Sequence, residues 1–176
     1  MAFSKPAENI DQFNLTTGMT VADFGAGSGA YALAMARCVG QSGRVYAIDV
    51  QKELLARLGR EAKAEHLANL EVIWSDLERA GGSKLADRLV DFVLFANLLF
   101  QISGQYTLFL EAKRILKPDG RLAVIDWRES YGNLGPPAER VIKIETVKDI
   151  ASQAGFVFQK EFSAGDHHYG LLFTLA

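Results

Sequence analysis

Residues 21–29 read Val-Ala-Asp-Phe-Gly-Ala-Gly-Ser-Gly: an apolar run ends in an acid, passes through three alternating glycines and continues as a helical pattern. Glycines in such a place allow positive φ and let the backbone approach a ligand bound at a helix N-terminus. The next apolar run ends at Asp49, twenty residues downstream of Gly29. A carboxylate at that position can accept hydrogen bonds from both hydroxyls of a ribose. The pattern therefore predicts a site for a nucleoside.

Short apolar runs alternate with helical patterns on either side of this stretch. Five runs are expected to be strands, at residues 20–24, 44–48, 70–74, 91–95 and 121–126. Helical patterns span residues 28–39, 51–66 and 106–116. Strands that are apolar almost throughout are typical of a parallel sheet covered on both faces. The order up to residue 126 is interpreted as βαβαβαβαβ, with right-handed crossovers.

The end of the chain changes character. A helix is expected near residues 145–154, and two strand-like runs follow at 156–162 and 169–175. The short glycine-containing connection between these runs predicts an antiparallel hairpin. Lys117-Pro118-Asp119-Gly120 predicts a turn before the fifth strand. The predicted fold is therefore α/β and doubly wound: a seven-stranded, mainly parallel sheet with a C-terminal antiparallel hairpin and helices on both faces.

Composition indicates one soluble domain. The chain has 176 residues, of which 49% are hydrophobic and 23% charged, and its net charge is −2. That charge gives no general attraction to nucleic acid or to an anionic membrane, so neither is expected as a partner. The single cysteine, Cys38, excludes a disulfide within the chain. No signal peptide is evident, the most hydrophobic stretch (89–102) is too short to span a bilayer, and no residues have metal-ligand spacing. We therefore expect a cytoplasmic protein without a metal, formed by one domain over residues 1–176 with a lid or helix segment at about 1–19.

The glycine motif has two interpretations. Gly25-x-Gly27-x-x-Ala30 fits the dinucleotide fingerprint, whereas Asp23-x-Gly25-x-Gly27-x-Gly29 fits the glycine loop of methyltransferases that use S-adenosylmethionine. Three features favour the second interpretation. Asp76 and Leu77 follow the third strand, where an acid suits the exocyclic amine of adenine. The C-terminal hairpin is expected of a methyltransferase sheet, and 176 residues leave little room for a second substrate domain.

On these motifs the chain resembles the class I S-adenosylmethionine-dependent methyltransferases over nearly its whole length. Two further segments match: residues 91–97, Asp-Phe-Val-Leu-Phe-Ala-Asn, and residues 116–122, Leu-Lys-Pro-Asp-Gly-Arg-Leu. In the second segment Asp119 stands where the family usually has glycine. The resemblance implies a Rossmann-like fold, S-adenosyl-L-methionine as cofactor, and methyl transfer by in-line displacement.

The resemblance also implies a set of cofactor-binding residues. Gly25, Ala26 and Gly27 would contact the methionine part, with Asp23 nearby, and Asp49 would hold the ribose. Val50 and Leu77 would sandwich the adenine. The full set is Asp23, Gly25, Ala26, Gly27, Gly29, Asp49, Val50, Asp76, Leu77 and Asn97.

Several of these residues also suit structural roles. Gly29 would equally serve close packing between a helix and a strand, and Asp49 would cap the helix that follows it. Asp76 suits a loop after a strand, and Asn97 suits loop capping. In the same alternative, Val50 or Leu77 would belong to the hydrophobic core and would not contact the adenine.

The acceptor site is expected beyond the fifth strand, at Trp127, Arg128 and Tyr131 and along the loop 129–138. The candidates for a general base are Asp126, Tyr131, His167 and His168, and none is assigned. Phe3, Pro6, Asn9 and Phe13 are the expected lid. Residues 97–100, Asn-Leu-Leu-Phe, lack the Asn/Asp-Pro-Pro-Tyr/Phe signature of enzymes that methylate exocyclic amines.

The leading hypothesis is a methyltransferase that acts on a small molecule. The alternatives are a binding module for S-adenosylmethionine or S-adenosylhomocysteine without turnover, such as a partner subunit, and, less favoured, a nicotinamide-dependent oxidoreductase. The sequence identifies neither the acceptor nor the oligomeric state.

Overall fold

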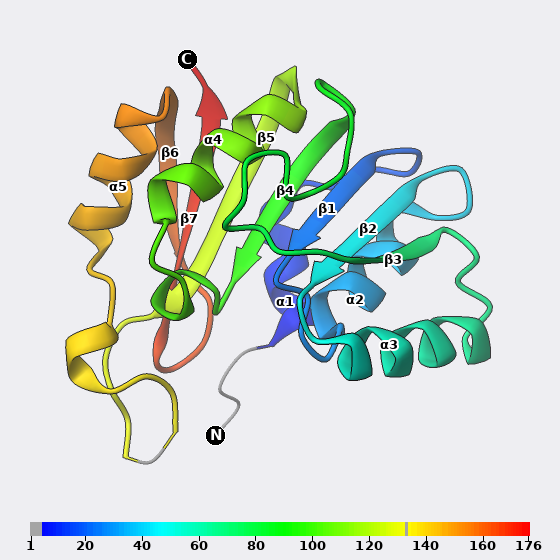
Figure 1. The fold of residues 1–176 in the computed structure, drawn as a ribbon, viewed down its shortest axis with the longest axis horizontal. Helices are drawn as coiled ribbons and strands as arrows, with labels where there is room; N and C mark the ends of the chain where they lie inside the picture. Colours follow the sequence, from blue (N-terminus) through cyan, green and yellow to red (C-terminus); the bar gives the residue numbers. More distant parts are fainter. Residues whose placement is uncertain (1–4, 133) are drawn as a thin grey trace.

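One seven-stranded sheet forms the centre of the structure, a computed structural model that describes residues 5–132 and 134–176 (Figure 1). The strand order is β3-β2-β1-β4-β5-β7-β6. The first five strands pair in parallel, whereas β7 is antiparallel to both β5 and β6. The strands are β1 (Thr20–Phe24), β2 (Arg44–Asp49), β3 (Leu70–Trp74), β4 (Val90–Ala96), β5 (Leu116–Trp127), β6 (Phe156–Ser163) and β7 (His168–Leu175). The predicted doubly wound sheet with a C-terminal hairpin is confirmed.

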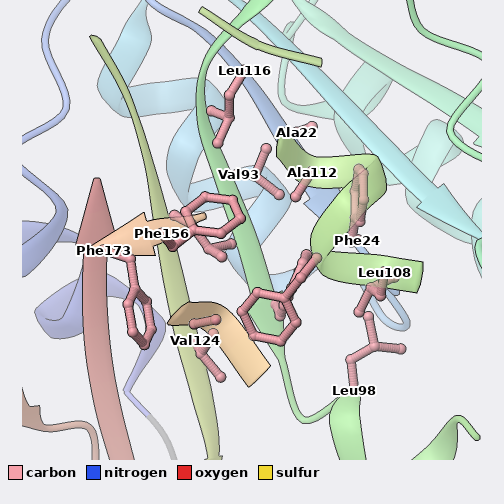
Figure 2. Close-up of a cluster of buried hydrophobic side chains, with 14 of the residues drawn as sticks. Ala22, Phe24, Val93, Leu98, Leu108, Ala112, Leu116, Val124, Phe156 and Phe173 are labelled. Atoms are coloured by element: carbon pink, nitrogen blue, oxygen red, sulfur yellow. The ribbon is translucent and has the colours of Figure 1, made fainter. Parts of the chain in front are cut away.

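Helices cover both faces because side chains of each strand point alternately to opposite sides of the sheet. The helices are α1 (Pro6–Ile10), η1 (Asp11–Phe13), α2 (Ala30–Val39), α3 (Lys52–Ala64), η2 (Leu99–Gln101), α4 (Gln105–Ile115), η3 (Ala138–Arg140) and α5 (Ile144–Gln153). Buried side chains of α4 and α5 share a core cluster with one face, and those of α1, α2 and α3 share a cluster with the other. Figure 2 shows the first cluster, where Phe24, Val93 and Val124 of the sheet lie near Leu108 and Ala112 of α4.

The connection between β3 and β4 departs from the predicted alternation. Residues 75–89 are all described and contain no helix, so the expected helix of the third βα unit is wrong. A Cβ at Gly82 would lie 2.2 Å from the carbonyl oxygen of Asp76, which shows how tightly this segment turns. The segment is fastened instead to α4, because the backbone N and the Oγ of Ser83 both donate to Glu111 Oε1 at 3.0 and 2.5 Å.

Strand β5 begins earlier than the sequence predicts. Its pairing with β4 moves from Leu116 opposite Val90 to Arg121 opposite Phe92, so residues 117–120 form a bulge within the strand. A Cβ at Gly120 would come within 2.8 Å of the Lys117 carbonyl oxygen, which explains the glycine. The predicted turn is therefore present as an interruption inside β5 and not as a loop before it.

All five parallel strands end at the same edge of the sheet. Figure 1 places α1, the loop that follows β5 and the β6–β7 connection at this edge, drawn at the bottom of the view. Within the described ranges, none of the helices has the length and apolar character needed to cross a membrane.

Candidate cofactor and acceptor site

A cleft made of two adjoining cavities crosses the carboxyl ends of β1, β2 and β4. The first, of about 200 Å³, is lined by Gly25, Gly27, Asp49, Val50, Gln51, Ser75, Asp76, Leu77, Glu78, Leu98, Gln101 and Ile102. The second, of about 440 Å³, is lined by Pro6, Asp23, Gly25, Ala26, Gly27, Ser28, Ala30, Tyr31, Ala96, Asn97 and Gln101. The two cavities share Gly25, Gly27 and Gln101. We call the first the β2 cavity and the second the β4 cavity.

The glycine loop forms the floor between the two cavities. Gly25 and Gly27 have φ values of 72° and 53°, which suit glycine better than other residues. A Cβ at Gly27 would meet only the Gly25 carbonyl oxygen, at 3.9 Å, so it would project into open space in the cleft. The backbone N–H groups of Gly25 and Ala26 donate to the Ile48 carbonyl oxygen, and that of Gly27 donates to Asp49. At Gly25 and Gly27 the loop therefore offers backbone without side chains to the cleft.

Asp49 joins the glycine loop to the start of α3. Its side chain is buried, and its two oxygens each accept one backbone N–H at 2.8 Å, from Gly27 and from Gln51. The bond to Gln51 corresponds to the local role that the sequence also suggests. Gln51, and not Asp49, occupies the N-cap position of α3, and its side chain makes no capping bond. A carboxylate has room for about four hydrogen bonds, so each oxygen retains capacity for one more donor from the cleft.

Gly29 lies outside the lining of both cavities. A Cβ there would come within 2.2 Å of Leu58 Cδ1, and Gly29 caps α2 with a φ of 84°. Its position corresponds to the packing role, in which the start of α2 closely approaches α3.

Asp23 is buried in the wall of the β4 cavity. Its side chain is 1% exposed, and neither oxygen has a hydrogen-bond partner among the described residues. Burial raises the pKa of this carboxyl to about 7, and the nearby Asp49 carboxylate adds to the rise. Among the described residues an ionised Asp23 has no compensating cation, and only the backbone N–H of Ala32 favours its charged form.

The far end of the β2 cavity is lined by Val50, Asp76 and Leu77. Leu77 is buried and Val50 is exposed, so the two give an apolar lining at different depths. Asp76 accepts the Glu78 N–H at 3.0 Å and pairs with Arg79 at 3.1 Å, which is the loop role noted from the sequence. Its partly exposed carboxylate nevertheless lines the cavity.

Asn97, at the end of β4, lines the β4 cavity with a φ of 55°. Its backbone N donates to the Ile125 carbonyl oxygen, and its own carbonyl oxygen accepts the Gln101 amide at 2.6 Å. These contacts fix an uncommon backbone conformation in a cavity wall, which is where such strain is often found.

The sequence did not identify the residues that follow Asn97. Leu98, Gln101 and Ile102 line the β2 cavity, and Gln101 lines both cavities. No motif marks them, because they reach the cleft through the short η2 helix and not through a strand end. Their only sequence signal is their place directly after the fourth strand.

The residues expected at the acceptor site lie together beyond β5, but they line neither cavity. Trp127 is only 9% exposed; its ring lies 4.3 Å from that of His168, and a Cβ at Gly135 would approach it to 2.7 Å. Arg128 pairs with Glu161 at 3.2 Å. Gly135 therefore packs on Trp127.

Tyr131 stacks on His167, with ring centroids 3.9 Å apart. The Nδ1 atom of His167 lies 2.9 Å from Glu129 Oε1. Asp126 is buried and accepts two backbone N–H groups. Of the four general-base candidates, Asp126 and His168 are thus buried, whereas Tyr131 and His167 belong to one cluster at the loop.

The residues expected to form a lid lie in different environments. Pro6 lines the β4 cavity. Asn9 is buried and donates to the Tyr31 hydroxyl at 2.7 Å and the Ala164 carbonyl oxygen at 3.0 Å. Phe13 is fully buried in the core, so it is no lid residue, and Phe3 lies outside the described residues.

Comparison with known proteins gives a consistent result. A family model described as a methyltransferase domain matches residues 15–166. The crystal structure of a SAM-dependent methyltransferase from Aquifex aeolicus is 32% identical, with a TM-score of 0.89 over 99% of this chain and 91% of that one. A putative type 11 methyltransferase from Sulfolobus solfataricus is 28% identical, with a TM-score of 0.73 over 99% of this chain and 94% of that one.

Among curated proteins, a ubiquinone/menaquinone biosynthesis C-methyltransferase from Paraburkholderia xenovorans is 27% identical over 91% of this chain and 61% of its own length. A demethylmenaquinone methyltransferase from a Geobacillus species is 26% identical over 68% of this chain and 50% of its own length. The chain thus spans about half to three fifths of the length of these curated relatives.

Proposed function

The chain belongs to the methyltransferase domain family, and we propose that it transfers a methyl group from S-adenosyl-L-methionine to a small-molecule acceptor. The observation that carries the proposal is the Asp49 carboxylate, buried at the end of β2 and lining a cleft whose floor is the Gly25–Gly27 backbone. Family and fold both imply S-adenosyl-L-methionine as the cofactor.

The β2 cavity fits the adenosine part of that cofactor. Asp49 has one unused acceptor position on each oxygen, and a ribose presents two hydroxyl donors. Val50 and Leu77 would contact the adenine ring, and Asp76 would accept its exocyclic amine. The alternative loop role of Asp76 is compatible with this contact, because a carboxylate keeps further lone pairs.

The β4 cavity fits the methionine part. Asp23 is a buried carboxylate without a partner among the described residues, and an α-ammonium group supplies both the charge and the donors that it lacks. The exposed backbone of Gly25, Ala26 and Gly27 permits the close approach that a Cβ at Gly27 would block. Gly29 would act indirectly, by setting where α2 begins.

When bound, S-adenosyl-L-methionine supplies a methyl group that is already electrophilic, because it is attached to a sulfonium. The chain's contribution is then to orient the acceptor and to exclude water. Asn97, with its fixed backbone at the end of β4, would lie on the side of the cleft that meets the acceptor. We keep Trp127, Arg128 and Tyr131 as proposed acceptor-side residues, which would require the loop 129–138 to admit the acceptor between Trp127 and the cleft.

The names of the curated relatives suggest the first acceptors to test. Those relatives are described as methyltransferases of demethylmenaquinone and of ubiquinone and menaquinone biosynthesis. Reduced quinones with a ring position open to methylation are therefore the first class, followed by small phenols, amines and carboxylates. A cytoplasmic location, expected from composition, belongs to the same proposal.

The test is transfer of labelled methyl from S-adenosyl-L-methionine to a panel of these acceptors by the purified protein, with Asp49→Ala as the matched control. The proposal expects labelled product with at least one acceptor and loss of most of it in the variant. If the protein binds the cofactor and no small molecule in the panel is labelled while a protein or RNA substrate is, the small-molecule part of the proposal is wrong.

A further inference from the structure

We propose that Asp126 is a positioning residue for the cofactor cleft: its carboxylate holds the η2 segment that forms one wall of the β2 cavity. The inference rests on the proposed function for its activity readout, but the contact that it invokes exists in the protein without a ligand. Asp126 lies on β5, and it lines neither cavity itself.

The carboxylate bridges two parts of the chain. Its Oδ2 accepts the backbone N–H of Leu99 at 3.0 Å, and its Oδ1 accepts the N–H of Trp127 at 2.8 Å. The side chain is 1% exposed, so these bonds form away from water. A buried carboxylate that accepts backbone N–H groups forms stronger bonds than a neutral acceptor would.

The segment held in this way lines the β2 cavity. Leu98, Gln101 and Ile102, on either side of Leu99, line the β2 cavity. Leu98 also contacts the glycine loop, since a Cβ at Gly25 would meet its Cδ1 at 2.7 Å. Helix η2 has a single turn and no side-chain cap. Its first residue, Leu99, is held at the backbone N–H by the Asp126 carboxylate and at the carbonyl oxygen by the Gln105 amide, at 3.2 Å.

The second bond joins this wall to the acceptor side. Trp127 directly follows Asp126 and packs against Gly135. One carboxylate therefore holds both the cofactor wall at η2 and the residue that begins the acceptor side. Such a bridge sets the relative position of the two sides of the cleft.

Burial raises the pKa of Asp126 to about 7, and the backbone N–H groups of Trp127, Leu99 and Phe100 oppose the rise. The titratable group that faces it from β7 is the Tyr169 phenol, its cross-strand partner. Burial raises the pKa of Tyr169 as well, so the phenol stays neutral and donates to the Ile142 carbonyl oxygen at 2.9 Å. His168, the neighbouring β7 residue, lies against Trp127, and η2 contributes no titratable side chain.

Protonation has a defined effect on this bridge. A neutral carboxyl keeps one good acceptor oxygen, and its hydroxyl oxygen is a poor acceptor for the second N–H group. Asparagine also has one acceptor oxygen, and its NH2 group takes the place of the other oxygen. The protonated wild type and the Asp126→Asn variant should therefore behave alike. They should differ only where the wild type is ionised.

The test compares the wild type with Asp126→Asn and with Asp91→Asn as a matched control. Asp91 is also a carboxylate that accepts a backbone N–H of a neighbouring strand, from Thr20 at 2.8 Å. It lies at the start of β4, whereas the η2 segment follows the end of that strand. The first readout is hydrogen exchange of peptides that cover residues 98–102, without ligand. Asp126→Asn should lose protection there at pH 8, and Asp91→Asn should not.

The second readout is the dissociation constant for S-adenosylhomocysteine from pH 5.5 to 8.5. Asp126→Asn should weaken binding about tenfold at pH 8.5, the loss expected for one charged hydrogen bond, and the difference should vanish below pH 6. A merely structural role would weaken binding equally at all pH values. If hydrogen exchange of residues 98–102 is unchanged in Asp126→Asn, the positioning role of Asp126 is wrong, whether or not the wild type binds the cofactor. If the exchange is altered but the wild type binds no cofactor, the positioning role stands and the proposed function is wrong.

Discussion

Replacing Asp49 by alanine tests the ribose contact on which the cofactor assignment depends. Each carboxylate oxygen already accepts one backbone N–H, from Gly27 and from Gln51, which leaves one acceptor position per oxygen for a ligand. Losing a hydrogen bond to a charged group costs roughly 1.5–3 kcal/mol. Asp49→Ala should therefore weaken S-adenosylhomocysteine binding about ten- to a hundredfold.

The variant also loses the bond that ties the glycine loop to β2, so the measurement needs a control. Glu53→Ala removes the same charge from the exposed first turn of α3, four residues away. Isothermal titration at one pH and ionic strength should give Glu53→Ala a dissociation constant within about twofold of the wild type, since exposed charges contribute little.

The refuting result is equally clear. If Asp49→Ala has a wild-type circular dichroism spectrum and binds S-adenosylhomocysteine with the wild-type dissociation constant, Asp49 is no ribose ligand. If Glu53→Ala weakens binding as much as Asp49→Ala, the effect is one of general charge and the same assignment is wrong.

Four further substitutions test the glycine assignments and the pH dependence of stability. Gly27→Ala should lower the unfolding free energy by only about 1 kcal/mol but reduce S-adenosylhomocysteine affinity more than tenfold. Gly29→Ala should lower the unfolding free energy by about 1–3 kcal/mol through overpacking and leave the affinity of the folded protein unchanged. The two assignments are contradicted if denaturant unfolding shows the larger loss of stability for Gly27→Ala and titration shows the larger loss of affinity for Gly29→Ala. The pKa of Asp23 in the folded protein is about 7, above its value in the unfolded chain, so the wild type loses stability as pH rises from about 4 to 7. Asp23→Asn avoids this loss, so its unfolding free energy should exceed that of the wild type by up to about 4 kcal/mol at pH 7, measured by urea unfolding without ligand. Hydrogen bonds from Arg114 and Ser83 outweigh burial and lower the pKa of Glu111 to about 2. Glu111→Gln should therefore lower the unfolding free energy by about 3 kcal/mol at pH 7, and this difference from the wild type should shrink as pH falls from about 4.5 to 2. A difference that stays constant with pH would contradict the role assigned to the Glu111 carboxylate.

The sequence predicted those parts of the fold that depend on short stretches of chain. Strands β1 and β3 have the predicted bounds, because their apolar runs are bounded by turn-forming residues. Gly25, Gly27 and Asp49 were placed in the cleft for a similar reason, since each stands at a strand end that the topology brings to one edge.

The sequence did not predict features that depend on contacts between distant residues. The β3–β4 connection reads like the site of a crossover helix, but its conformation is set by the Ser83 contacts with Glu111, 28 residues away. Gln101 lines both cavities only because η2 folds back over the glycine loop, held by Asp126, 27 residues from Leu99. No local pattern encodes such contacts.

Phe13 was misread for a related reason. An aromatic residue in a short N-terminal segment suggests a lid, but η1 directs Phe13 into the core, where its ring centroid lies 5.0 Å from that of Phe92. Only the packing of α1 and η1 on the sheet distinguishes these two roles.

The most direct test of the central claim is a parallel calorimetric titration of the wild type with S-adenosyl-L-methionine, S-adenosylhomocysteine and NAD. We predict saturable binding of the first two at one site per chain and no binding of NAD. Binding of NAD alone would contradict it, because Asp49 would then hold the ribose of a dinucleotide and the chain would not use a methyl donor.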